Sequence, residues 1–217
     1  MSEIPILYTY FRSTCSARVR IALNWKQIEY TPFFINLLKN EQNDKEYLEK
    51  NPGHSIPMLS IDNIDIAEST AIIEYLEETR PQNPLLPKLP ADRANVRRIM
   101  NMIACGIQPL QNPPQLALFP LEKRAERART VISNGFDSLE KVVAKTAGKY
   151  SVGDSVTAAD LYLYPMYHAA QRYDVETKNY PTINRVFGEL NKLEPFTKAA
   201  WYNQPDCPEK LKTKNQL

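Results

Sequence analysis

The stretch STCSARVRIAL (residues 13–23) places hydroxyls and a thiol directly before an apolar segment with helical spacing. The first N–H groups of a helix have no partner within it, so a helix start favours negative charge. On residue types alone, Ser13 is an ordinary N-cap, and Cys15 fits both a nucleophile activated by the helix start and an inert buried thiol.

Other catalytic chemistry finds little support in the composition. The three cysteines, Cys15, Cys105 and Cys207, are far apart and odd in number, which favours reduced thiols in the cytosol over a disulfide framework. Only His54 and His168 are present, without a CxxC or HExxH motif, so we expect no metal site. The same scarcity argues against Ser-His-Asp or Cys-His catalysis.

The charge pattern argues against nucleic-acid and membrane partners. The net charge of +2 is spread along the chain and forms no basic block. The N-terminus has an acidic residue and a proline where a secretory signal carries basic and apolar residues, and no run of about 18 apolar residues occurs. We therefore expect a soluble cytoplasmic protein whose partner is a small molecule or another protein.

The first part of the chain alternates strand and helix signals. Residues 6–11 predict a strand and the segment after it a helix, and residues 30–36 predict a second strand, which Pro32 restricts to a sheet edge. A short helix near 43–50 precedes strands at 58–61 and 64–67, joined by a turn at Asp62 and Asn63, and a helix at 69–80. This βαβ–ββα order predicts an α/β thioredoxin-like domain over residues 1–82.

The rest of the chain is predicted to be helical. Residues 80–90 contain four prolines in eleven residues, so 83–90 is interpreted as a linker. Helical periodicity then covers about 91–119, 122–146, 158–173 and 182–193, which predicts an all-α domain over 91–217. The segment PLQNPP (109–114) must interrupt the first of these helices, and it places Gln108 to Asn112 on irregular backbone. Thr157 and Asp160 predict a capping box, with Asp in place of Glu.

These features together resemble a cytosolic glutathione transferase. STCSARVRIAL is similar to the zeta-class signature, usually Ser-Ser-Cys-x-x-Arg-Val-Arg-Ile-Ala-Leu. AIIEYLEETRP (71–81), GIQPLQN (106–112) and QPD (204–206) also resemble that class. Two positions depart from it: Thr14 stands where serine is commoner, and Ala17 stands where a bulky residue is frequent, a change expected to widen the cleft.

The resemblance implies glutathione as cofactor and a set of site residues. Ser13 and Cys15 are implied as catalytic, with Cys15 lining the thiol site. Lowering the pKa of the glutathione thiol by two units takes roughly 2.7 kcal/mol, and a helix end contributes only about 0.3 to 1 kcal/mol. The Ser13 hydroxyl and the backbone N–H groups of Cys15 and Ser16 are therefore expected to donate to the thiolate as well. A cis Pro57 would let the Ile56 backbone pair with the cysteinyl part of glutathione. Arg172, and with it Arg12, is implied to bind substrate carboxylates. The glutathione-binding residues that the resemblance implies are Ser13, Thr14, Cys15, Ser16, Ala17, Arg18, Gln42, Ile56, Pro57, Glu68, Ser69, Gln108 and Asn112.

Within that set, Glu68 is expected to pair with the γ-glutamyl ammonium, Ser69 to bind the γ-glutamyl carboxylate at a helix start, and Gln42 to reach the glycyl carboxylate. Each also has an ordinary structural interpretation, since ES before a helix is common capping, Gln108 and Asn112 can satisfy broken backbone, and an isolated arginine is usually solvated.

The resemblance implies maleylacetoacetate isomerase activity in phenylalanine and tyrosine catabolism, by a homodimer in the cytoplasm. In this mechanism the glutathione thiolate adds to the cis double bond of a dicarboxylate, the bond rotates, and elimination gives the trans product, fumarylacetoacetate. Two alternatives remain open: a transferase that conjugates or dehalogenates 2-haloacids and other electrophiles, and a binding module with this fold that has no catalytic activity.

Overall fold

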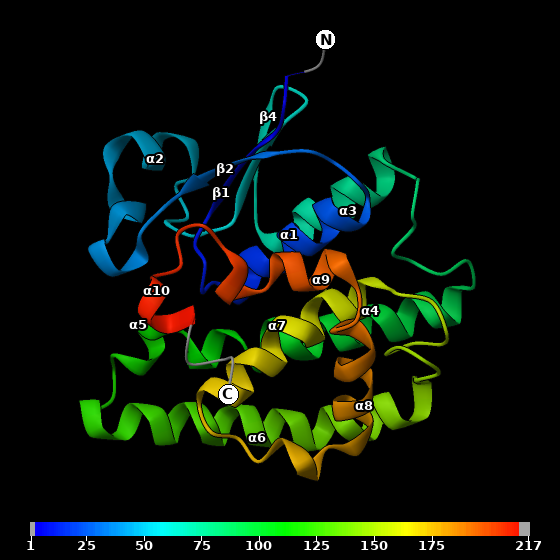
Figure 1. Cartoon of the computed structure of the whole chain (residues 1–217). Coiled ribbons are helices and arrows are strands. Elements are labelled where there is room, and N and C mark those ends of the chain that lie inside the picture. Colours follow the sequence, from blue (N-terminus) through cyan, green and yellow to red (C-terminus); the bar gives the residue numbers. More distant parts are fainter. Residues whose placement is uncertain (1–2, 213–217) are drawn as a thin grey trace. The chain divides into compact units, whose positions relative to one another are not determined.

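The chain folds into two compact units. The computed structural model describes residues 3–212 (Figure 1). One unit contains the described residues up to Pro84 together with those from Glu194 onward, and the other contains Leu85–Leu193. The prediction of a single domain over 91–217 is therefore wrong for its last part. The segment from Glu194 joins the first unit because Phe196 is fully buried beside Trp25 and Arg20 donates to the Ala199 carbonyl.

The first unit is built on a four-stranded sheet with the order β2-β1-β3-β4. β1 is parallel to β2 and antiparallel to β3, which is antiparallel to β4. The edge position of β2 confirms the prediction from Pro32, which has no N–H to donate to a second neighbour. The predicted ranges of β3 and β4 are confirmed, and β1 and β2 are shorter than predicted. The strands are β1 (Ile6–Thr9), β2 (Thr31–Phe34), β3 (Met58–Ile61) and β4 (Ile64–Ala67).

The predicted helices of this unit are present, and three short elements near the C-terminus join them. α1 packs against α3 and against α9, which comes from the far end of the chain (Figure 1). The late elements were not predicted because none is long enough to show a helical period. The helical elements are α1 (Thr14–Trp25), η1 (Leu37–Lys39), η2 (Glu41–Asn43), α2 (Lys45–Lys50), α3 (Ser69–Thr79), α9 (Glu194–Ala199), η5 (Trp201–Asn203) and α10 (Glu209–Lys212).

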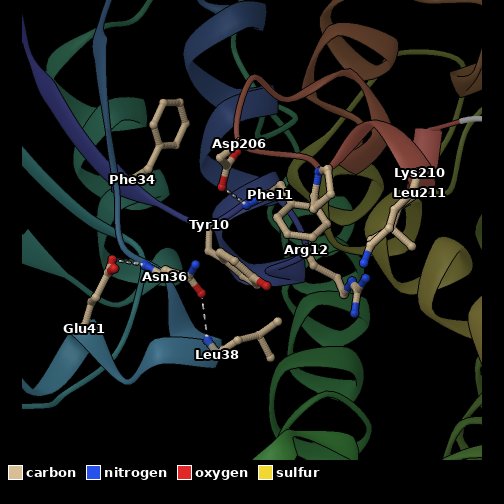
Figure 2. A pocket seen from close by; sticks show the side chains of 11 residues that line it. Tyr10, Phe11, Arg12, Phe34, Asn36, Leu38, Glu41, Asp206, Lys210 and Leu211 are labelled. Carbon is tan, nitrogen blue, oxygen red and sulfur yellow. Dashed lines mark hydrogen bonds between the residues drawn. The ribbon is translucent and has the colours of Figure 1, made fainter.

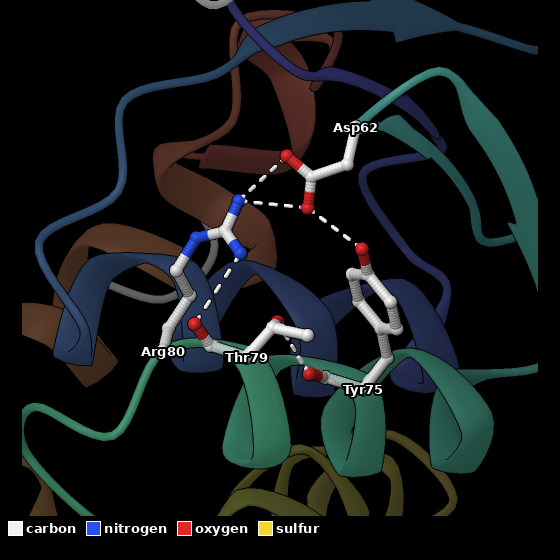
Figure 3. Close-up of polar contacts among 4 residues, drawn as sticks. All are labelled: Asp62, Tyr75, Thr79 and Arg80. Carbon is white, nitrogen blue, oxygen red and sulfur yellow. Dashed lines mark hydrogen bonds and ion pairs between the residues drawn. The ribbon is translucent and has the colours of Figure 1, made fainter.

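A polar cluster fixes the β3–β4 hairpin to the end of α3 (Figure 3). Asp62 and Asn63 both have positive φ, 52° and 62°, as expected of a two-residue turn matched to the twist of the strands. Arg80 Nη2 lies 2.8 Å from both carboxylate oxygens of Asp62, and the Tyr75 hydroxyl donates to the same carboxylate at 2.7 Å. These contacts lower the pKa of Asp62, the Tyr75 hydrogen bond most strongly.

The second unit is helical, as predicted. α7 is buried along almost its whole length and packs against α4, α6 and α8. The predicted interruption at 109–114 is confirmed, and α4 begins at Pro90, one residue inside the predicted linker. Among the helices of residues 3–212, none combines the length and the apolarity needed to cross a bilayer. The elements are α4 (Pro90–Gly106), η3 (Pro109–Gln111), α5 (Pro113–Leu116), α6 (Leu121–Thr146), α7 (Ala158–Arg172), η4 (Thr177–Asn179) and α8 (Pro181–Leu190).

The capping box at the start of α7 is confirmed. Asp160 is fully buried, and its carboxylate accepts from the N–H of Thr157 at 2.8 Å and from the N–H of Ser151 at 2.9 Å. Burial raises the pKa of Asp160, and the hydrogen bonds from Ser151 and Thr157 act in the opposite direction. The cap thus also fastens the loop before α7 to the helix start.

Candidate active site

Several chain segments meet at one end of the sheet, where β1 and β2 finish. β1 pairs Tyr8 with Met58 of β3, and Met58 pairs with Ala67 of β4. β2 runs parallel to β1 and places Phe34 opposite Thr9. The residues that follow β1, β2 and β4 therefore gather with those that precede β3. Because α1 and α3 both start at this end of the sheet, two helix N-termini lie there, and both favour bound anions.

Ser13 is the N-cap of α1. Its Oγ accepts from the Ser16 N–H at 3.1 Å. A hydroxyl can accept and donate at once, so the hydrogen of Ser13 remains for another acceptor. Within residues 3–212 nothing accepts from the N–H of Thr14 or Cys15. One hydroxyl hydrogen and two N–H groups at this helix start are therefore left for a ligand.

Ser16 differs from the expectation. The sequence placed its N–H beside that of Cys15 as a donor to a thiolate, but the structure gives this N–H to Ser13 Oγ. The Ser16 side chain is fully buried, whereas Cys15 is half-buried. The backbone of Cys15 is therefore better suited than that of Ser16 to donate to a ligand.

Arg18 connects the two helix starts. It is 2% exposed, and its Nη1 donates to Ser69 Oγ at 3.2 Å. Ser69 is the first residue of α3 and is itself buried, so the guanidinium fixes the hydroxyl of that helix start. Ala17, in the next position of α1, is buried as well. Direct contact of Arg18 or Ala17 with a ligand stays a prediction; the structure gives Arg18 a positioning contact.

The segment before β3 offers backbone groups to a ligand. The Ile56–Pro57 peptide bond is cis, the geometry on which the expectation for Ile56 depended. Neither the N–H nor the C=O of Ile56 has a hydrogen-bond partner in the described part of the chain. Glu68, at the end of β4, is exposed and has φ 69°. Gln42 in η2 has a buried Oε1 without a partner among residues 3–212.

A pocket of about 440 Å³ lies in this unit beside Arg12, the residue next to Ser13 (Figure 2). Among the site residues predicted from the sequence, Arg12 alone lines it. Its walls come from the loop after β1, the segment after β2 and the C-terminal segment. The lining residues are Tyr10, Phe11, Arg12, Phe34, Asn36, Leu38, Glu41, Asp206, Pro208, Lys210 and Leu211.

The two carboxylates of the pocket are bound to backbone. Asp206 Oδ2 accepts from the Phe11 N–H at 2.8 Å, and Glu41 Oε2 accepts from the Asn36 N–H at 2.6 Å. Burial raises the pKa of Asp206, against the hydrogen bond from Phe11 and the attraction of Arg20. Among the described residues, no ion pair within 4.0 Å involves either cation of the pocket, Arg12 or Lys210.

Arg20 holds the loop that carries Arg12 and Ser13. It is 1% exposed, and burial lowers its pKa to about 10, so it stays charged at neutral pH. Its guanidinium donates to the carbonyls of Tyr10 and Phe11 at 3.3 and 3.2 Å, and to Ala199 O at 3.0 and 3.1 Å. A further bond of 3.0 Å reaches Thr9 Oγ1. No local pattern in the sequence indicated this role for Arg20.

Three predicted site residues lie in the second unit. Gln108 Nε2 donates to Asn112 Oδ1 at 2.7 Å, so within this unit the two amides pair with each other across η3. Arg172 is exposed at the end of α7, with its guanidinium 5.1 Å from the ring centre of Tyr173. Their assignments to glutathione or substrate remain predictions.

Comparison with known proteins matches both units. The family model described as "Glutathione S-transferase, N-terminal domain" covers residues 7–84, and "Glutathione S-transferase, C-terminal domain" covers residues 118–198. The chain is 49% identical over 211 residues to the maleylacetoacetate isomerase of Mus musculus, covering 96% of this chain and 98% of that protein.

Solved structures agree with these matches. A bacterial maleyl pyruvate isomerase described as a zeta-class glutathione S-transferase has a TM-score of 0.90 and 34% identity, covering 94% of this chain and 100% of that one. The maleylacetoacetate isomerase of Anaeromyxobacter dehalogenans 2CP-1 with bound GSH has a TM-score of 0.87 and 35% identity, covering 96% and 100%. A second structure of that enzyme contains dicarboxyethyl glutathione and citrate in its active site, with a TM-score of 0.86 and 34% identity, covering 96% of each chain.

Proposed function

Because the chain belongs to the glutathione S-transferase family, and within it to the zeta class, we propose that it catalyses the glutathione-dependent cis–trans isomerisation of maleylacetoacetate to fumarylacetoacetate. The observation that carries this proposal is the start of α1, where the Ser13 hydrogen and the N–H groups of Thr14 and Cys15 are left for an acceptor. Relatives with the same activity in their names match almost the whole chain.

The residues at this end of the sheet fit glutathione. A tripeptide needs main-chain partners, and the N–H and C=O of Ile56, which have no partner among residues 3–212, provide one of each. Its γ-glutamyl carboxylate suits the start of α3 at Ser69, and its ammonium suits the exposed Glu68. Gln42 has a buried amide oxygen still without a partner within residues 3–212 and is assigned to the glycyl end.

Ser13 keeps the bound thiol ionised. When bound, glutathione supplies a thiolate that adds reversibly to the cis double bond and leaves again after the bond has rotated. The Ser13 hydroxyl donates to this sulfur, and the Cys15 N–H adds a second donor at the positive end of α1. Two such donors plus the helix end supply the roughly 2.7 kcal/mol that a shift of two pKa units requires. Cys15 itself lines the site.

Arginines orient the substrate. Maleylacetoacetate has a carboxylate at each end, and a guanidinium binds a carboxylate through two parallel hydrogen bonds. Arg12 is next to Ser13 in the chain and lines the pocket, which supports its assignment to the substrate. Arg172 is assigned to the same task on the resemblance alone.

Purified protein, maleylacetoacetate and glutathione test the proposal. We expect isomerisation that requires glutathione and leaves its concentration unchanged, followed by the ultraviolet change of the substrate and by a thiol assay. Consumption of glutathione together with halide release from a 2-haloacid, without isomerisation, would instead identify a conjugating transferase. Absence of glutathione-dependent turnover on every substrate would contradict the assignment.

The cellular setting is part of the same proposal. We propose a homodimer in the cytoplasm that acts in phenylalanine and tyrosine catabolism. Free Cys15, Cys105 and Cys207 are compatible with a reducing compartment. Light scattering of the purified protein tests the dimer, and fractionation of the source cells tests the location.

A further inference from the structure

The C-terminal segment contributes a basic residue, Lys210, to the pocket, and this residue lies outside the stretch STCSARVRIAL. Lys210 lies in α10 and lines the pocket together with Pro208 and Leu211. Asp206 holds this segment on the loop after β1 through its bond to the Phe11 N–H, and Cys207 is buried in a cluster with Tyr10 and Phe11. The position of Lys210 is therefore set by contacts with the loop that carries Arg12.

Within residues 3–212, the pocket cations Arg12 and Lys210 have no carboxylate partner within 4.0 Å. In Figure 2, Arg12 and Lys210 extend toward the same side of the pocket, while Glu41 and Asn36 lie on the other side. Glu41 is bound by the Asn36 N–H. Asp206 is bound by the Phe11 N–H and is attracted by the buried Arg20, which offsets its charge. The side with Arg12 and Lys210 is thus left positive, and such a site attracts an anion.

We propose that Lys210, with Arg12, binds the substrate carboxylate remote from the reacting double bond and so makes the enzyme selective for dicarboxylates. This inference rests on the proposed function, because it concerns the same substrate. Arg12 directly precedes Ser13, and consecutive Cα atoms are only about 3.8 Å apart. A substrate whose double bond meets the sulfur beside Ser13 therefore extends into the pocket. Tyr10, Phe34 and Leu38 give its middle an apolar surround.

The geometry favours a carboxylate as the group that reaches Lys210. Arg12 offers a planar pair of donors and Lys210 a compact point charge, a combination that suits an anion with two oxygens. Because Lys210 is exposed, its contribution is screened by water and salt. We therefore expect a moderate effect that falls as ionic strength rises.

Paired substrates test this inference in the full-length protein. Maleylacetone keeps the reacting cis double bond and one carboxylate of maleylacetoacetate but lacks the remote carboxylate. The variant Lys210→Met keeps most of the apolar stem and removes the charge. We expect it to raise KM for maleylacetoacetate about fivefold, the factor for about 1 kcal/mol. KM for maleylacetone and KM for glutathione should not change, and Lys210→Arg should restore the parent KM.

A binding measurement separates recognition from turnover. Calorimetry measures binding without any reaction. The two ligands are suberate, a dicarboxylate of the same chain length as the substrate, and octanoate, its monocarboxylate counterpart. Lys210→Met should weaken suberate about fivefold and leave octanoate unchanged, and the difference should shrink in high salt. Lys212→Met is the matched control, because Lys212 is in the same helix, pairs with Glu209 at 2.7 Å and does not line the pocket.

The outcomes distinguish the two proposals. If the parent isomerises both substrates but Lys210→Met changes both KM values equally, the inference is wrong and the proposed function stands. A raised KM for glutathione in Lys210→Met would also overturn it, by assigning Lys210 to the cofactor. If the parent isomerises neither substrate, the proposed function fails, while the suberate titration still decides whether Lys210 binds dicarboxylates.

Discussion

Ser13 performs two tasks with different parts of one hydroxyl. The oxygen accepts the Ser16 N–H and caps α1, while the hydrogen is left for the sulfur of a bound thiol. The capping interpretation and the catalytic interpretation of this residue are therefore compatible. The cap also uses the Ser16 N–H, which leaves the Cys15 N–H as the next donor.

Removing the Ser13 hydroxyl should raise the pKa of the bound glutathione thiol. A charge-assisted hydrogen bond contributes about 1.5 to 3 kcal/mol, so Ser13→Ala should raise that pKa by about one to two units and reduce turnover at neutral pH by a factor of about 10 to 100. The ultraviolet absorbance of the thiolate, recorded against pH in the binary complex, measures this shift.

Two further variants complete that test. Ser13→Thr keeps a hydroxyl at the N-cap and should retain a lowered thiol pKa. Cys15→Ala should keep isomerase turnover, because the reacting sulfur belongs to glutathione. If Ser13→Ala left the thiol pKa unchanged while Cys15→Ala abolished turnover, the roles given to the two residues would have to be exchanged.

At the scale of elements, the β3–β4 hairpin is attached to α3 at the end of the sheet away from the site. Asp62 carries this attachment through Arg80 and Tyr75. Its pKa is lower in the folded protein than in the unfolded chain, so the carboxylate stabilises the fold above its unfolded pKa of about 3.9. This stabilisation is lost as the pH falls through the folded pKa.

The variant Asp62→Asn should therefore be less stable than the parent at pH 7 and at pH 5, with the difference shrinking below about pH 4. Urea unfolding at each pH measures it. Glu78→Gln is a suitable control, because Glu78 is exposed in the same helix. A difference that stays constant down to the lowest pH would mean that the ion pair and the Tyr75 bond are not its source.

Most of the elements could be predicted from local patterns. Pro32 identified the edge strand, Asp62 and Asn63 identified the hairpin turn, and Thr157 with Asp160 identified the start of α7. Each of these signals acts within a few residues, so the sequence contains it directly. α9 and α10 escaped prediction because they have six and four residues, too few to show a helical period.

At the scale of the whole molecule, contacts between distant parts of the chain hold the candidate site together, and these were not predictable. Arg20 joins Tyr10 and Phe11 to Ala199, and Asp206 returns to Phe11. The motif QPD was noticed only through a resemblance, since no local rule indicates that Asp206 binds a backbone group 195 positions earlier. Lys210 escaped notice for the same reason.

Arg20 should be critical for stability. Arg20→Met leaves the buried carbonyls of Phe11 and Ala199 without a donor among the described residues, and each such loss costs about 1 to 3 kcal/mol. The Tyr10 carbonyl also loses this donor but keeps the Ser13 N–H at 3.1 Å. We expect the free energy of unfolding to fall by at least about 2 kcal/mol. Chemical denaturation measures it, and Arg98→Met, the same change at an exposed position, should alter it by less than about 0.5 kcal/mol. A loss below about 1 kcal/mol for Arg20→Met would show that water replaces the guanidinium.

Because Cys207 is buried, the rate at which a reagent modifies it reports how often the C-terminal segment detaches. Cys105 is exposed and Cys15 half-buried, whereas Cys207 is buried and burial raises its pKa. An alkylating reagent should therefore modify Cys207 last, and only during moments when the segment from Gln204 to Leu211 detaches from the loop at Tyr10 and Phe11. In a protein whose other two cysteines are already blocked, the labelling rate of this one thiol measures how often the pocket wall opens.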